Sequence, residues 1–178
     1  LIRRQLMNML VQPAPLPEEM DRGYLGRIMR INGYRTPKDA VEAIAAHFGE
    51  EGRTRRDLTT HERLSRMAGM TTEHVAQCHT TLPLRRGITS YLPKLVHGCG
   101  ERTSLLYVSG TLRKYPAAFF CEECVRADIQ FHGTAYWRRD LQTPGQLWCS
   151  KHSKPLNFVV GKDPFLASPA VYVVSAPK

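Results

Sequence analysis

The sequence predicts a mainly α-helical protein that ends in a small, metal-stabilised β-hairpin module. Two observations predict this fold class. Apolar residues recur at helical spacing through the first half of the chain, and two pairs of metal-ligand residue types lie in the second half. The 178 residues are 42% hydrophobic and 23% charged, which is ordinary for a globular protein. Wholesale disorder is therefore excluded, and no apolar run approaches the roughly 20 residues that span a bilayer.

Residues 1–57 are expected to form an N-terminal helical region. A proline-rich lead over residues 13–17 is too rigid and too poor in N–H donors for a helix. A helix should follow and end at Asn32-Gly33, because Met20, Tyr24, Ile28 and Ile31 recur at helical spacing. A second helix should begin after Thr36, an N-cap residue followed by Pro37, and should stop before Gly49.

Residues 58–115 are expected to hold a helix-turn-helix and basic loops. Thr59 and Glu62 have the spacing of a capping box, and Gly69 accepts the positive φ of a tight turn. Leu64, Met67 and Ala68 should face the core from the first helix. The second helix should contribute Met70, Val75 and Cys78. This layout allows the second helix to enter a DNA major groove, but it also serves a purely architectural helical corner.

The positive charge of the chain concentrates in this middle region. The net charge is +9, and residues 58–115 carry eight basic but only three acidic residues. Such an excess favours a polyanionic partner, although solvated basic turns are equally compatible with it. The side chains expected to contact nucleic acid lie on the helix-turn-helix and in two basic loops: Arg66, Thr71, Thr72, His74, Gln77, Arg85, Arg86, Arg113 and Lys114.

The strongest pattern in the chain is a pair of knuckles in residues 116–160. Cys121 and Cys124 are separated by two residues, and after 24 intervening residues Cys149 and His152 repeat that spacing. Three thiolates and one imidazole complete a tetrahedron, which predicts one structural Zn²⁺ with no open coordination position for catalysis. Two short strands, 136–141 and 145–148, are expected to form a zinc-finger-like hairpin between the knuckles. Residues 161–178 are expected to be a C-terminal tail.

The remaining cysteines and the enzyme motifs give no catalytic site. Cys78 and Cys99 are expected to be spare thiols, because the odd count of five cysteines and the lack of a secretory signal disfavour a disulfide framework. A zinc deaminase would need His-x-Glu with Pro-Cys-x-x-Cys, and both are absent. The run from His61 to Ser65 fails the zinc-protease pattern at its last position. The sequence therefore predicts a protein that is not an enzyme.

Four stretches in this order resemble the TniQ family of bacterial transposition proteins. Residues 15–34 resemble the family's opening helix, and residues 64–75 (Leu-Ser-Arg-Met-Ala-Gly-Met-Thr-Thr-Glu-His-Val) resemble its helix-turn-helix. Residues 120–128 are similar to its first zinc knuckle, and residues 135–139 with 147–156 resemble the hairpin and closing Cys/His pair. The family often has a further Cys-x-x-Cys pair, which residues 157–163 lack. This indicates a short single-zinc member or a longer protein cut before a DNA-reading half.

The resemblance implies a non-catalytic adaptor for transposon target selection. Such a protein would couple target recognition, by DNA itself or by a CRISPR effector complex with its guide RNA, to an AAA+ regulator of the TniB/TnsC type. That regulator would then recruit the transposase. The resemblance also implies a bacterial cytoplasmic, nucleoid-associated protein without a membrane partner, and it allows a homodimer. The alternative function is a sequence-specific transcription regulator built from the helix-turn-helix and the zinc module.

Overall fold

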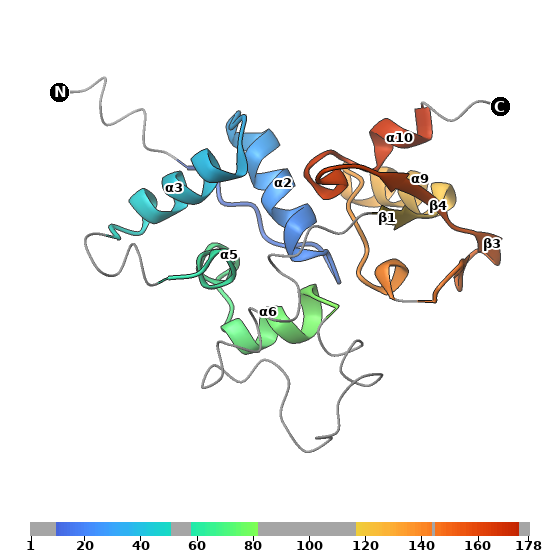
Figure 1. Cartoon of the computed structure of the whole chain (residues 1–178), viewed down its shortest axis with the longest axis horizontal. Coiled ribbons are helices and arrows are strands. Elements are labelled where there is room, and N and C mark those ends of the chain that lie inside the picture. Colours follow the sequence, from blue (N-terminus) through green and yellow to red (C-terminus); the bar gives the residue numbers. More distant parts are fainter. Residues whose placement is uncertain (1–9, 51–57, 82–116, 144, 175–178) are drawn as a thin grey trace, which may run out of the picture.

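The computed structural model describes residues 10–50, 58–81, 117–143 and 145–174, which form two halves in contact (Figure 1). The first half holds four helices: α2 (Asp21–Asn32), α3 (Pro37–His47), α5 (Thr60–Ala68) and α6 (Thr72–His79). The second half holds β1 (Ala117–Phe120), α9 (Glu122–His132), the 3-10 turn η2 (Asp140–Gln142), β2 (Trp148–Cys149), β3 (Lys154–Pro155), β4 (Asn157–Val160), the 3-10 turn η3 (Pro164–Leu166) and α10 (Ala170–Val174). The predicted fold class is confirmed.

Local signals set the ends of the helices in the first half. Gly33 ends α2 with a φ of 73°, in the left-handed region that glycine adopts without strain. Thr36 caps α3 by accepting a hydrogen bond from the backbone N–H of Asp39. Thr59 and Glu62 form both hydrogen bonds of the predicted capping box, and Gly69 turns the chain with a φ of 64°. The predicted helix-turn-helix is thus present as α5, a tight turn and α6.

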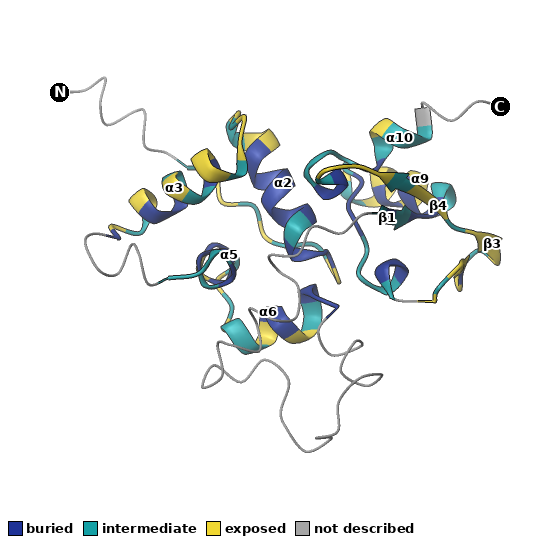
Figure 2. Ribbon diagram, in the orientation of Figure 1, coloured by how far each residue is buried: buried dark blue, intermediate teal, exposed yellow. Residues whose placement is uncertain are grey.

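The core of this half lies where α2, α3 and α5 meet. It contains Tyr24, Leu25, Ile28, Ile44, Leu64 and Met67, among other buried residues. Figure 2 shows the buried faces turned toward one another and the exposed faces turned to solvent. Ile31 does not join this core, because its side of α2 faces outward and leaves the residue 47% exposed. Leu25 and Met29 extend the apolar face of α2 instead.

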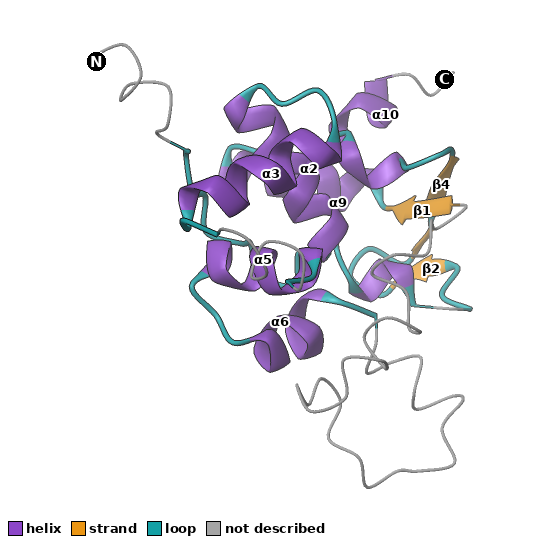
Figure 3. Ribbon diagram, turned by 60° about the vertical axis from the view of Figure 1, so that its left-hand side comes forward, coloured by secondary structure: helices purple, strands orange, loops and turns teal. Residues whose placement is uncertain are grey.

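The predicted hairpin between the two knuckles is wrong. Residues 125–132 continue helix α9, which ends at Gly133 with a φ of 71°. Residues 136–141 form an extended stretch and the turn η2, because Trp137 is buried as a core residue and not paired in a ladder. The strands pair elsewhere: β2 pairs with β3 directly at the second knuckle, and β1 pairs antiparallel with β4. Figure 3 places both strand pairs on the same side of the molecule.

The segment expected to be a tail instead completes a second core. Phe165 is 1% exposed and packs with Met20, Phe120 and Trp137. The Trp137 indole N–H donates to the carbonyl of Ala167 at 2.8 Å. Since Met20 precedes α2 and Trp137 lies in the second half, this core joins the two halves. The predicted division at residue 160 therefore does not separate two packing units.

Close packing of α2 against the C-terminal segment requires a glycine. A Cβ atom at Gly26 would lie 2.6 Å from the carbonyl oxygen of Leu166 and 2.8 Å from that of Phe165. A side chain would therefore push the turn η3 away from the helix. The absence of a side chain at this position lets the backbones of α2 and η3 touch.

Candidate metal centre and helix-turn-helix

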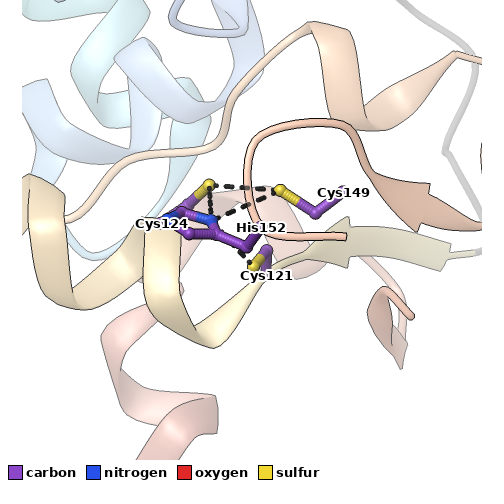
Figure 4. A group of neighbouring side chains, drawn as sticks. All are labelled: Cys121, Cys124, Cys149 and His152. Atoms are coloured by element: carbon purple, nitrogen blue, oxygen red, sulfur yellow. Dashed lines mark hydrogen bonds between the residues drawn. The ribbon is translucent and has the colours of Figure 1, made fainter. Parts of the chain in front are cut away.

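Four ligand side chains from two separate segments converge in the second half of the molecule. Cys121 lies between β1 and α9, and Cys124 lies in the first turn of α9. Cys149 ends β2, and His152 lies in the turn between β2 and β3. The three sulfurs and one imidazole nitrogen all lie within 4.8 Å of one another (Figure 4). The cysteines are buried and His152 is half-buried, so the group opens little to solvent.

The separations within the group match those of a tetrahedral metal site. The Sγ atoms of Cys124 and Cys149 are 3.6 Å apart, and the three sulfurs lie 3.4 to 3.5 Å from Nδ1 of His152. A tetrahedron with bonds of about 2.3 Å to sulfur and about 2.0 Å to nitrogen has edges of about 3.8 Å and about 3.5 Å. These four separations therefore suit one metal ion bound by all four residues. Three thiolates with one imidazole are a donor set typical of structural zinc.

The electrostatics of the cysteines also favour a bound cation. Burial raises the pKa of the Cys124 thiol, and its hydrogen bond to Cys149 and the neighbouring thiols add to the effect. Burial also opposes ionisation of Cys149, but hydrogen bonds from His152 and Lys151 outweigh it and lower the pKa of that thiol to about 7. Several thiolates so close together repel one another, so a central positive charge is needed for all three to ionise.

A buried ion pair supports the first knuckle from behind. Asp128 lies one turn after Cys124 on α9 and is 2% exposed. Its carboxylate accepts two hydrogen bonds from Arg138, one of them from Nε at 3.1 Å. Burial raises the pKa of Asp128, while the hydrogen bonds and charge of Arg138 act in the opposite direction. The backbone of Arg138 forms an isolated antiparallel β-bridge with the backbone of Glu19, and this bridge ties the metal module to the N-terminal region.

The helix-turn-helix presents one face of α6 and buries the other. Val75, Ala76 and His79 are buried, whereas Thr71, His74 and Gln77 are exposed. Helix α6 was expected to bury Met70 and Cys78, but these two residues are only half-buried. His79 is buried instead, and its Nδ1 lies 2.8 Å from the carbonyl oxygen of Glu19. This contact fixes the end of α6 against the start of α2.

The residues expected to contact nucleic acid fall into three groups. His74 and Gln77 project from the exposed face, and Thr71 lies there too but also caps α6 by accepting from the His74 N–H. Thr72 is half-buried, and Arg66 is tied to Glu50, with 3.3 Å between Nη1 and Oε1. The basic-loop residues lie outside the described ranges, as does Cys99: Arg85, Arg86, Arg113 and Lys114.

Sequence reasoning missed the residues that fasten the helix-turn-helix to the rest of the molecule. Arg139 donates from Nη1 to the Gln77 carbonyl at the end of α6 and from Nη2 to Glu18 at 2.9 Å. His61 on α5 is 3% exposed, and its Nε2 lies 3.0 Å from the Thr72 carbonyl. The only trace of this role in the sequence is the two adjacent arginines at 138–139. Two neighbouring arginines ordinarily lie on the solvated surface, so they do not by themselves indicate a buried contact.

The fold and the site together define a helical protein in which a helix-turn-helix is joined to a Cys₃His metal module. The model of the TniQ family matches residues 10–156, and the chain belongs to that family. This is a non-catalytic family associated with transposition, so the chain is a transposition-associated protein. No curated protein and no solved structure matched. Among the described residues, no helix is long and apolar enough to cross a membrane.

Proposed function

We propose that this chain is a non-catalytic adaptor that couples recognition of a transposition target to an AAA+ regulator of the TniB/TnsC type. The target-recognising element would be DNA itself or a CRISPR effector complex with its guide RNA. The regulator would then recruit the transposase, which performs the chemistry. Family membership supports the pathway, and the helix-turn-helix supports the contact with nucleic acid. The proposal places the protein in the bacterial cytoplasm at the nucleoid.

The proposed contact with nucleic acid rests on helix α6, which is held at both ends by hydrogen bonds and leaves one face exposed. His79 and Arg139 hold its C-terminal end, and His61 holds its first turn through the Thr72 carbonyl. His74 and Gln77 remain exposed on the opposite face. A helix held at both ends can enter a groove without losing much conformational freedom, which is how recognition helices contact bases.

The metal module would have a structural role. Zn²⁺ is the ion that three thiolates and one imidazole at these separations suit best. With Cys121, Cys124, Cys149 and His152 all bound, no position remains for water or substrate. We therefore assign the ion to the stability of the module and not to a reaction. In this role it holds Arg138 and Arg139 where they contact the N-terminal half.

Co-sedimentation with the regulator tests the adaptor role. The zinc-loaded chain is mixed with its cognate AAA+ regulator, with and without duplex DNA, and the regulator is pelleted by centrifugation. We expect the chain to pellet with the regulator and to be retained more strongly when DNA is present. A chain that stays in the supernatant under both conditions would exclude the adaptor role.

A gel-shift comparison separates the adaptor from a transcription regulator. An adaptor should bind random and selected duplexes with similar, weak affinity, whereas a regulator should bind a selected duplex at nanomolar concentration without a partner. Replacing His74 and Gln77 by alanine should weaken DNA binding, with a loss of about 1–3 kcal/mol for each base contact removed. Gln130→Ala, at an exposed position on α9, is the matched control and should leave DNA binding unchanged.

A further inference from the structure

The β1–β4 ribbon has an apolar face that points away from the core. Its register pairs Ala118 with Val159 on the inner face and Phe119 with Phe158 on the outer face. The outer rings of Phe119 and Phe158 lie 6.0 Å apart between centroids. Phe158 is 62% exposed, and Val160, two residues further on the same face, is 69% exposed. Such exposure is unusual for large apolar side chains next to each other on a strand.

The two edges of this ribbon differ. On the β1 edge the side-chain amide of Gln142 takes the place of a neighbouring strand. It accepts from the Phe119 N–H at 2.9 Å and donates to the Phe119 carbonyl at 2.7 Å. Because both backbone groups of Phe119 point toward Gln142, the Phe119–Phe158 pair is of the non-hydrogen-bonded type. The backbone groups of Phe158, and by the same alternation those of Val160, therefore point outward from β4.

The β4 edge is open among the described residues. No described residue forms a hydrogen bond with the outward N–H and C=O groups of Phe158 and Val160. Proteins ordinarily protect such an edge with a proline, a charged residue or a bulge. Residues 157–160 (Asn-Phe-Val-Val) contain none of these protections. The edge thus offers both main-chain hydrogen bonds and apolar contacts to an added strand.

We propose that the β4 edge binds an extended segment of another protein by strand addition. The partner segment would be apolar at alternate positions, to cover Phe158 and Val160, and acidic at the end that lies beside Lys162. Strand addition supplies affinity through main-chain hydrogen bonds and specificity through alternate side chains. This surface needs neither DNA nor the transposition regulator, so its test is independent of the proposed function.

Charge argues for an acidic partner over a second copy of this chain. Each copy has a net charge of +9, and exposed Lys154 and Lys162 flank β4 on both sides. Lys154 is paired with Glu123 at 2.7 Å, whereas exposed Lys162 follows the C-terminal end of β4 by two residues. Pairing two β4 edges would bring two positive copies together without an acidic residue on either strand.

A displayed library of random strand-length peptides, panned against the full zinc-loaded chain, supplies the probe. We expect the selected peptides to alternate apolar residues and to carry Asp or Glu at one end. Hydrogen exchange followed by NMR should show the Phe158 and Val160 amides exchanging rapidly in the free chain and slowly in the complex. The Val159 amide, which points into the ribbon, should be protected in both states.

Two variants distinguish the edge from the apolar face. Val160→Pro removes the outward N–H together with the valine side chain and should weaken peptide binding about tenfold, while the ladder to β1 persists. Val160→Thr keeps that N–H, so its binding loss should be smaller. Peptides that bind Val160→Pro as well as the parent chain, or that protect other amides, would overturn the proposal. Failure to select any peptide would overturn it too, as would self-association that Val160→Pro abolishes.

Discussion

The two halves of this molecule are each stabilised in a different way. The helical half buries apolar stripes of α2, α3 and α5, and its helices end at caps and glycines. The other half has strands of only two to four residues, and four ligand side chains converge on one point in it. Short strands bury too little surface to be stable alone, so this half should depend on a metal ion. The helical half should depend on packing and on buried ion pairs.

Loss of a metal ligand should have the largest effect and should act on one half first. Structural zinc contributes about 10–16 kcal/mol in small modules, so Cys121→Ser should unfold residues 117–174 while α3 and α5 keep most of their protection. Hydrogen exchange with mass spectrometry measures both halves in one experiment. Cys78→Ser, a half-buried thiol outside the ligand group, is the control and should change little. Equal loss of protection in both halves would show that they do not differ in this way.

Breaking a buried ion pair should be the largest effect within the helical half. Arg27 donates to both carboxylate oxygens of Glu19, at 2.9 and 2.6 Å, and Glu19 is fully buried. Glu19→Ala would leave the Arg27 charge buried without its partner, at a cost of about 3–5 kcal/mol. Urea unfolding measures the change. The exposed Lys38–Glu42 pair, 3.9 Å apart, provides the control, and Lys38→Ala should leave the midpoint unchanged.

A methyl group added at Gly26, where α2 touches η3, should lower the stability of the fold by an intermediate amount. Gly26→Ala places a Cβ 2.6 Å from the Leu166 carbonyl oxygen, so α2 and η3 must separate. Overpacking of this kind costs about 1–3 kcal/mol, and thermal unfolding should occur at a lower temperature. At Gly161 an added Cβ meets no atom within 4 Å, so Gly161→Ala should leave the unfolding temperature close to that of the parent. If the two variants unfold alike, the contact between the halves is not tight.

The smallest effect concerns a buried acid in the helical half. Burial raises the pKa of Asp21, although His61, Arg22 and His79 act in the opposite direction. A carboxyl with a raised folded pKa stabilises the fold below its unfolded pKa and loses that contribution as pH rises through the folded pKa. Asp21→Asn removes this titration, so the stability of the variant relative to the parent should increase as pH rises from 3.8 upward. A pH-independent difference in urea midpoints would contradict this assignment.

The sequence predicted features that depend on neighbours in the chain and failed on those that depend on the fold. Thr59 and Glu62 lie one turn apart, so their capping box is a local property. The metal ligands could be predicted because each pair has the two-residue separation of a zinc knuckle. The extended stretch after α9 was misassigned because its apolar residues suit a strand as well as a core segment. The contact of Arg139 with the Gln77 carbonyl spans 62 positions, and no local pattern encodes it.

Native mass spectrometry of the full chain tests the central claim, that one metal ion bound by four side chains organises the second half. We expect a mass increase of one Zn²⁺ per chain, retained in Cys78→Ser and lost in Cys149→Ser and His152→Ala. A parent chain that is fully folded without any metal ion would contradict it, as would Cys149→Ser retaining the ion.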